Sequence, residues 1–171
     1  AGEHLLVLQR TGHLAIFDLA SGELQAAVQV GDGPRDVVVA PAGDRAYVTD
    51  LDGYVIEVSL SSLSGIGAIA TGGRLYGADI KPTGTFIYAA NNQLDDLDMI
   101  DLREDSPTYR SVAGRVPHAS SPIAVAISPD GQYAYSLSAD ENVLIVTATG
   151  EGPLLTHVTP RAAPVGARLV M

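Results

Sequence analysis

The sequence predicts an all-β protein, because one pattern of two apolar strands joined by a glycine turn recurs along its 171 residues. The clearest copy is P-I-A-V-A-I-S-P-D-G-Q-Y-A-Y-S-L-S at residues 122–138. Its β-branched and aromatic residues favour extended backbone, and the Pro129-Asp130-Gly131 triplet favours a turn. Further copies occupy residues 36–49 and 77–90, and in all three copies a tyrosine follows four residues after the turn glycine.

The chain divides into four repeats of about forty residues, which is the period of β-propeller blades. We therefore expect a propeller of four-stranded antiparallel blades, with four blades per chain. Helix content should be close to nil, because no window shows a capped 3.6-residue apolar stripe. The expected strands are residues 4–9, 13–19, 24–30, 35–40, 45–50, 54–60, 66–71, 76–81, 85–91, 97–102, 109–116, 123–128, 132–138, 143–148, 154–159 and 165–170.

The first repeat is divided between the two ends of the chain. Residues 1–7 match residues 42–48, so the chain begins one strand late. Residues 163–171 match the segment that starts near Asp32, so we expect the C-terminal strand to complete the first blade. The whole chain, 1–171, is then one propeller unit. Its expected blades are 165–171 plus 1–31, then 33–73, 74–117 and 122–160.

Composition narrows the possible partners. A formal net charge of −10 disfavours nucleic acid and anionic membranes, which need a dense basic surface. The absence of cysteine excludes disulfides and thiolate metal sites, and it leaves periplasm, exterior and cytosol open. The apolar stretches have strand length and are interrupted by charges, so we expect no membrane-inserted segment.

Specific motifs resemble a known family. Y-V-T-D at 47–50, followed by G-Y-V-I-E-V, and S-P-D-G-Q-Y-A-Y with N-V-L-I-V resemble the YVTN-type, WD40-like β-propeller repeat of surface-layer and periplasmic proteins. The likeness covers the whole chain, although the hallmark P-x-x-V-x-x-S-P-D-G is complete only at 122–131. It implies a periplasmic or extracellular location, and it implies ring closure with seven or eight blades.

Four blades are therefore expected to form half of an eight-bladed ring. A lone half would expose apolar blade faces and unpaired strand edges. Two chains arranged head to tail would remove both hazards, with residues 165–170 of one chain pairing with residues 4–9 of the other. A homodimer is thus the expected partner arrangement. A self-closed four-bladed ring and a fragment completed by a different chain are the alternatives.

Candidate binding residues lie in the loops that lead into the innermost strands, at what we call the top face. The ligand-binding candidates are Arg35, Arg74, His118 and Arg161. Arginines at one channel mouth could bind carboxylate or phosphate groups bidentately, so a small anionic ligand or a protein could bind there. The alternative is that the arginines pair with neighbouring polar loops, which carry Asp50, Asp52, Asn91, Asp95, Asp96 and Asp140.

Neither a metal site nor a catalytic constellation is predicted. The four histidines, at positions 4, 13, 118 and 157, lack ligand spacing. The acidic run at 95–101 lacks the D-x-D-x-D-G pattern of a calcium loop. We expect Asp101 to cap the turn after its strand, and we expect Asp95, Asp96 and Asp98 to form a solvated acidic loop.

The favoured function is therefore a non-catalytic binding or assembly module that self-associates into a closed ring, without a cofactor. The alternative comes from the family resemblance. YVTN-like propellers are similar to haem-binding and quinone-dependent periplasmic oxidoreductases, in which histidines and arginines at the channel mouth hold the cofactor.

Overall fold

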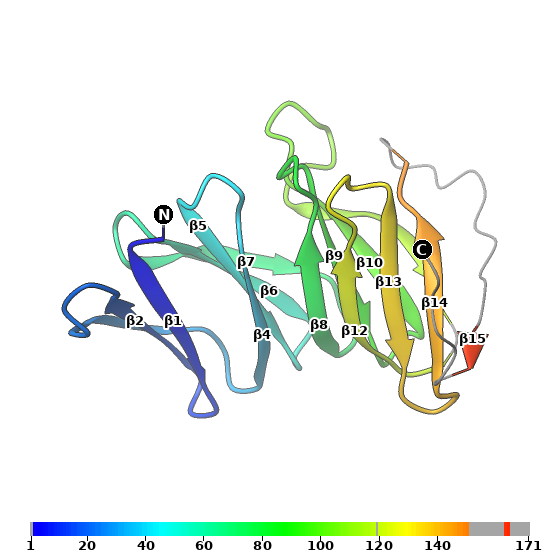
Figure 1. The fold of residues 1–171 in the computed structure, drawn as a ribbon, viewed down its shortest axis with the longest axis horizontal. Helices are drawn as coiled ribbons and strands as arrows, with labels where there is room; N and C mark the ends of the chain where they lie inside the picture. Colours follow the sequence, from blue (N-terminus) through cyan, green and yellow to red (C-terminus); the bar gives the residue numbers. More distant parts are fainter. Residues whose placement is uncertain (1, 119, 151–162, 165–171) are drawn as a thin grey trace.

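The protein folds as four successive antiparallel β-sheets, seen in a computed structural model that describes residues 2–118, 120–150 and the backbone of 163–164 (Figure 1). No helix occurs among the described residues, so none of them could form a membrane-spanning helix. The expectation of an all-β protein is confirmed.

Each sheet is one blade, and its strands are hydrogen-bonded in chain order. Blade 1 contains β1 (His4–Gln9), β2 (His13–Asp18) and β3 (Leu24–Gln29). Blade 2 contains β4 (Pro34–Val39), β5 (Arg45–Asp50), β6 (Tyr54–Ser59) and β7 (Ser64–Ala70). Blade 3 contains β8 (Leu75–Ile80), β9 (Phe86–Asn91), β10 (Asp96–Asp101) and β11 (Ser111–Pro117). Blade 4 contains β12 (Pro122–Ile127), β13 (Tyr133–Ser138), β14 (Val143–Ala148) and β15 (Ala163–Pro164).

The strands of blade 1 agree with the prediction, whereas most of the predicted C-terminal strands cannot be compared. In blade 1 the described strands correspond to the second, third and fourth strands of the other blades, as the sequence indicated. The strands expected at 154–159 and 165–170 lie outside the described residues. Ala163 and Pro164 pair with Leu144 and Val143 and so lie beside β14, although neither residue belongs to an expected strand. Proline, which lacks an N–H, is compatible with an outer edge strand.

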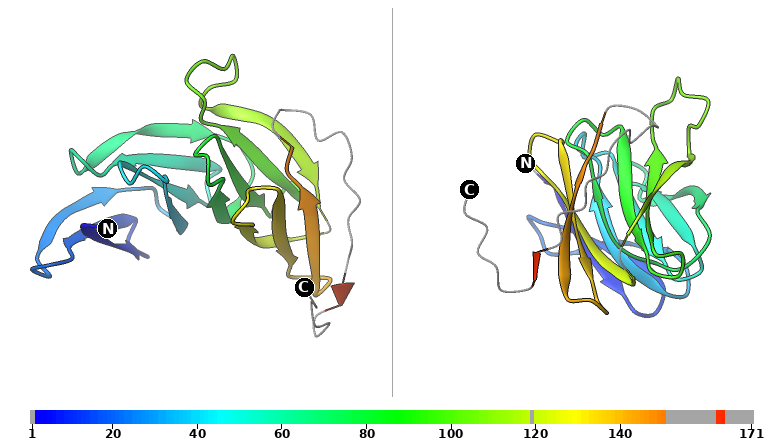
Figure 2. Two further views of the ribbon diagram at one scale, coloured as in Figure 1. Left: turned by 45° about the horizontal axis from the view of Figure 1, so that its top comes forward. Right: turned by 90° about the vertical axis from the view of Figure 1, so that its right-hand side faces the viewer.

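The blades follow one another along an open arc, with blade 1 and blade 4 at its opposite ends (Figures 1 and 2). Their innermost strands β4, β8 and β12 pack in that order, and β1 packs on β4. Within the described residues the four blades therefore form part of a propeller and do not close as a four-bladed ring.

Apolar residues between the blades form the core. One cluster, including Leu14, Ile16 and Val48, joins blades 1 and 2, and another, including Val55, Leu75 and Ile87, joins blades 2 and 3. Strands β9 and β10 are buried along their whole length because blade 3 has a neighbour on each side. This is the physical reason why β9, with the sequence F-I-Y-A-A-N, is almost continuously apolar instead of alternating.

Candidate functional site

Loops from successive strands meet at the top face. There the loop that leads into each innermost strand bonds to the turn between the second and third strands of the same blade. The amide of Leu51 donates to Gly33 O (3.1 Å), and the amide of Asn92 donates to Arg74 O (2.9 Å). In blade 4 the amide of Ala139 donates to Ser121 O (3.0 Å). The loops predicted to build one mouth are therefore adjacent within each blade.

In blades 2, 3 and 4 the last residue of the second strand holds these loops together. Asp50 Oδ2 accepts from the Gly33 amide (2.9 Å), and Ser138 Oγ donates to Ser120 O (2.5 Å). Asn91 Oδ1 accepts from the Arg74 amide (3.2 Å). All three side chains are buried, so Asp50 and Asn91, which we considered as possible partners for the arginines, instead bind backbone.

Glycine is required beside these polar side chains. Gly73 has φ +76°, and an added Cβ would lie 2.1 Å from Asn91 Oδ1. Gly31 has φ +101°, and its Cβ would lie 2.3 Å from Asp50 Oδ2. The left-handed backbone and the close approach both exclude a larger residue at these positions.

Arg35 lies on β4 and is exposed. Its guanidinium carbon is 5.3 Å from the centre of the Tyr76 ring on β8, a cation–π contact between neighbouring blades. Tyr76 in turn packs against the apolar cluster of Ala90, Leu97 and Val116. The Tyr76 ring, held by this apolar cluster, thus positions the guanidinium of Arg35 at the mouth.

Arg74 is exposed in the loop before β8. It lines a shallow hollow of about 430 Å³ together with Asp32, Asp52 and Gln93. Among the ion pairs of the described residues, none involves Arg74 or Arg35. The carboxylates of Asp32 and Asp52 nevertheless share the hollow with Arg74, so pairing with the acidic loops stays the alternative to ligand binding.

His118 is half-buried between blades 3 and 4. Its Nε2 lies 2.7 Å from Ser136 Oγ on β13, and its backbone amide donates to Asp95 O (3.0 Å). Arg35, Arg74 and His118 thus belong to one face but have different surroundings on successive blades. The fourth candidate, Arg161, lies outside the described residues, as does His157.

A buried charge cluster was missed by the sequence analysis. Asp98 is completely buried, and its carboxylate accepts from Arg115 Nε (2.8 Å) and from Asn91 Nδ2 (2.8 Å). Arg115 also lies 3.6 Å from Asp96 and donates to Thr71 O of blade 2 (2.7 Å). Burial, followed by the Asp98 charge, raises the pKa of Asp96 to about 6, and burial also raises the pKa of Asp98.

Our expectation of a solvated loop is therefore wrong for Asp96 and Asp98, which are the first and third residues of β10. Their spacing of two, which puts both on one face of a strand, was the available signal. Asp101, by contrast, caps its turn as expected. It accepts from Arg103 Nη2 (2.7 Å), Ser106 Oγ (2.5 Å) and Thr108 Oγ1 (2.7 Å). Among the described residues, no three His, Asp or Glu side chains are grouped so that they could hold a metal ion.

Four successive antiparallel blades packed face to face, with their loops gathered at one mouth, define part of a β-propeller. The chain belongs to the family described as "Lactonase, 7-bladed beta-propeller", whose family model matches residues 10–165. The β-propeller in our motif-based expectation is thereby confirmed.

Two solved structures share the fold. Kuenenia stuttgartiensis hydrazine synthase has a TM-score of 0.69 and 21% identity over 85% of this chain and 42% of its own. Dihydro-heme d1 dehydrogenase NirN in complex with DHE has a TM-score of 0.74 and 18% identity over 95% of this chain and 35% of its own. The chain thus spans less than half the length of either structure. No curated protein matches it.

Proposed function

We propose that the chain is a non-catalytic binding and assembly module that closes its propeller with a second copy of itself. The observation that carries the proposal is a group of exposed apolar side chains at each end of the arc, within the part of the chain that the structure describes. On blade 1, Leu5 is 50% exposed and Leu24 is 56% exposed, and both are paired with Phe17 across the sheet. On blade 4, Tyr133 is 43% exposed and Leu137 is 41% exposed.

The free edge of blade 1 supports the same proposal. Strand β1 has β2 as its one paired neighbour among the described residues. Its residues alternate between half-buried and exposed, whereas the corresponding strand β5 is buried over five of its six residues. An unpaired edge beside an exposed apolar face favours addition of another strand and another blade.

A second copy related by a two-fold axis would supply both a strand for the free edge of β1 and a blade for the exposed apolar face. Blade 1 of each copy would pack on blade 4 of the other, so a head-to-tail contact would close into a ring. Two copies would give eight blades, whereas the family description names seven, so the competing arrangement is a ring completed by blades of a longer chain. The proposal includes membership of the YVTN subgroup, on the Y-V-T-D and S-P-D-G motifs.

Mass in solution tests the assembly. Light scattering at micromolar concentration should give twice the mass of one chain. Leu5→Lys should produce monomers, because it places a charge on the proposed interface. The matched control is Ile66→Lys on β7, since Ile66 is 45% exposed but belongs to an interior blade, and it should leave the dimer intact. A monomeric mass for the unchanged chain would overturn the proposal.

Binding is proposed at the top face around Arg35, Arg74, His118 and Arg161. Support comes from the two exposed guanidiniums, which have no carboxylate partner among the described residues. A ligand with carboxylate or phosphate groups could pair with them bidentately. Calorimetric titration with citrate should show binding that Arg35→Gln combined with Arg74→Gln weakens about tenfold, equivalent to about 1.4 kcal/mol. Unchanged affinity in that double variant would move the site elsewhere.

A cofactor-binding, oxidoreductase-like propeller is the second candidate, with haem or quinone at the channel mouth. It is favoured by the position of His118 at the mouth and by a structural neighbour that is named as a dihydro-heme d1 dehydrogenase. Titration with haem should then give a saturable Soret band that His118→Ala removes. A spectrum that stays that of free haem would eliminate the haem version.

The family description adds a direct test of the non-catalytic proposal, because it names a lactonase. Hydrolysis of a δ-lactone can be followed at constant pH as the release of acid. We expect the rate with protein to equal the rate in buffer. Saturable hydrolysis that disappears in His118→Ala would replace the binding module with an enzyme.

A further inference from the structure

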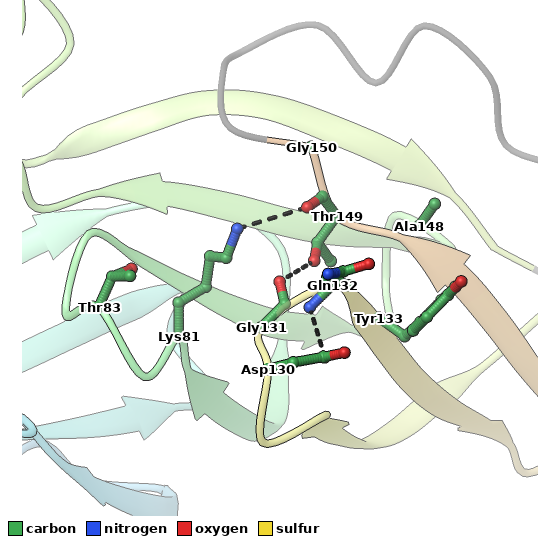
Figure 3. A pocket seen from close by; sticks show the side chains of 9 residues that line it. All are labelled: Lys81, Thr83, Asp130, Gly131, Gln132, Tyr133, Ala148, Thr149 and Gly150. Atoms are coloured by element: carbon green, nitrogen blue, oxygen red, sulfur yellow. Dashed lines mark hydrogen bonds between the residues drawn. The ribbon is translucent and has the colours of Figure 1, made fainter.

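A second pocket lies at the opposite end of the blades from the top face (Figure 3). It has a volume of about 470 Å³ and is formed between blades 3 and 4 by the turn after β8, the turn between β12 and β13, and the end of β14. The loop before β8 builds the top face, whereas Lys81, in this pocket, follows the last residue of β8. The two sites are therefore separated by the length of a strand.

Lys81 is the single lysine of the chain and is only 4% exposed. Its Nζ donates to Thr149 O at 3.4 Å, as Figure 3 shows, and none of the ion pairs among the described residues involves it. An ammonium group has three donors, so two are left without a partner in the described part of the chain. Burying an uncompensated charge is costly, and an anion in the pocket would offset that cost.

The local sequence explains why the ammonium group points into the pocket. Lys81 begins the turn K-P-T-G, where blade 4 has S-P-D-G, so a long cationic side chain replaces a turn-forming serine. Its stem passes beneath Gly131, where an added Cβ would lie 3.4 Å from Lys81 Cε. Thr149 is fixed by its hydroxyl, which donates to Gly131 O (2.6 Å), and by its amide, which donates to Gln132 O (2.8 Å). Two hydrogen bonds therefore fix Thr149, the residue whose carbonyl oxygen accepts from Lys81.

The rest of the lining suits a small anion. Thr83, Gln132 and Tyr133 bring a hydroxyl, a primary amide and a phenol that can donate neutral hydrogen bonds. Asp130 is the one acid among the described residues of the lining, and its Oδ1 already accepts from Ser128 Oγ (2.5 Å) and from the Gln132 amide (3.0 Å). These bonds, the Ser128 hydroxyl first, lower its pKa. Asp130 is thus committed to its own turn and does not pair with Lys81.

We propose that this pocket binds a small organic or inorganic anion whose carboxylate or phosphate group pairs with Lys81. The site is separate from the top face, because every described residue that lines it lies at the opposite end of blades 3 and 4. Tyr133 belongs both to this lining and to the face of blade 4 that is proposed to close the ring. It would make the module a two-site protein, with exposed arginines at one end and a buried lysine at the other.

The single lysine makes the test specific. In a protein with ¹³C-labelled lysine, the ε-methylene signal reports Lys81 alone. Sodium phosphate and sodium acetate are titrated in separate experiments, with sodium chloride reduced to keep the ionic strength constant. We expect a saturable shift with at least one of the two, and the comparison of phosphate with acetate identifies the preferred group. A shift that stays linear, or that chloride alone reproduces, would overturn the proposal.

Two variants separate this site from the top face. Lys81→Met keeps the apolar stem and removes the charge, so binding of the preferred anion measured by calorimetry should fall at least tenfold. Arg35→Gln combined with Arg74→Gln should leave the Lys81 shift unchanged. Loss of the Lys81 shift in that arginine double variant would assign the anion to the top face instead. If Lys81→Met fails to fold, the titration of the unchanged protein still decides the question.

Discussion

The carboxylate of Asp36 accepts a hydrogen bond from the backbone amide of Ala78, with 3.0 Å between Oδ2 and N, and so joins the innermost strands of blades 2 and 3. Asp79 repeats the arrangement one blade further, because its Oδ2 accepts from the Ile127 amide (2.7 Å). The other oxygen of each carboxylate accepts from the next residue of its own strand, Val37 or Ile80. Since separate sheets share no ladder hydrogen bonds, these carboxylates supply polar links between blades.

Replacing either link should destabilise the fold. Asp36→Ala or Asp79→Ala leaves a partly buried amide without its charged acceptor, and we expect a loss of about 1–3 kcal/mol in the free energy of unfolding. Urea denaturation followed by circular dichroism measures it. The control is Asp44→Ala, an exposed carboxylate 3.7 Å from Arg45, which should change stability by less than about 0.5 kcal/mol. Equal effects at Asp36 and Asp44 would contradict the inferred link.

Asp96 should make stability depend on pH between about 4 and 6. Its pKa in the folded state is raised to about 6 from 3.8, so the folded state binds the proton more tightly than the unfolded state does. The stability that it contributes is complete below the unfolded pKa and is lost as the pH rises through about 6. Asp96→Asn should remove a change on the order of 2 kcal/mol in the free energy of unfolding between pH 4 and pH 7.

Denaturation midpoints at pH 4, 5, 6 and 7 provide the measurement for Asp96. The exposed Asp52→Asn is the control, and it should reproduce the slope of the unchanged protein. A slope in Asp96→Asn equal to that of the unchanged protein would rule out Asp96 as its source.

Asp101 should have the opposite pH dependence. Its hydrogen bonds, that from Arg103 first, lower its pKa, so the stability that it contributes is present above the unfolded pKa of 3.8 and is lost as the pH falls. Asp101→Asn should cost about 1–3 kcal/mol at pH 7, because the substitution removes the charge of a fully buried carboxylate that accepts several hydrogen bonds. Asp18 is the matched control, since it caps the corresponding turn of blade 1 but is more exposed. Asp18→Asn should cost clearly less than Asp101→Asn in the same thermal or chemical unfolding experiment.

Gly72 and Gly73 offer a comparison at the same φ angle. Both have φ +76°, but an added Cβ meets nothing within 4 Å at Gly72, whereas at Gly73 it would lie 2.1 Å from Asn91 Oδ1. Asn91 is fully buried and cannot move freely. Gly72→Ala should therefore cost about 1–2 kcal/mol from backbone strain alone. Gly73→Ala should cost clearly more in denaturant unfolding, and equal costs would show that Asn91 does not restrict this loop.

Within the described residues, the sequence by itself determined the strands and the turns between them, from residue 4 to residue 148. Periodic apolar runs and turn residues act over a few neighbouring positions, so the S-P-D-G turn at 128–131 and the strands around it could be recognised from local pattern. The cap at Asp101 was also predictable, because its partners lie within seven residues along the chain.

Only the tertiary structure decided which polar residues are buried and what they contact. Asp98 meets Arg115 across a strand pair, Arg35 meets Tyr76 across a blade boundary, and Lys81 meets Thr149 over 68 positions of sequence. The first contact depends on the register between β10 and β11, and the other two depend on how the blades pack against one another. No local pattern encodes that register or that packing. Desolvation is a property of the assembled fold and not of the segment. The sequence of the acidic run at 95–101 therefore predicted a solvated loop, although blade 2 covers part of it.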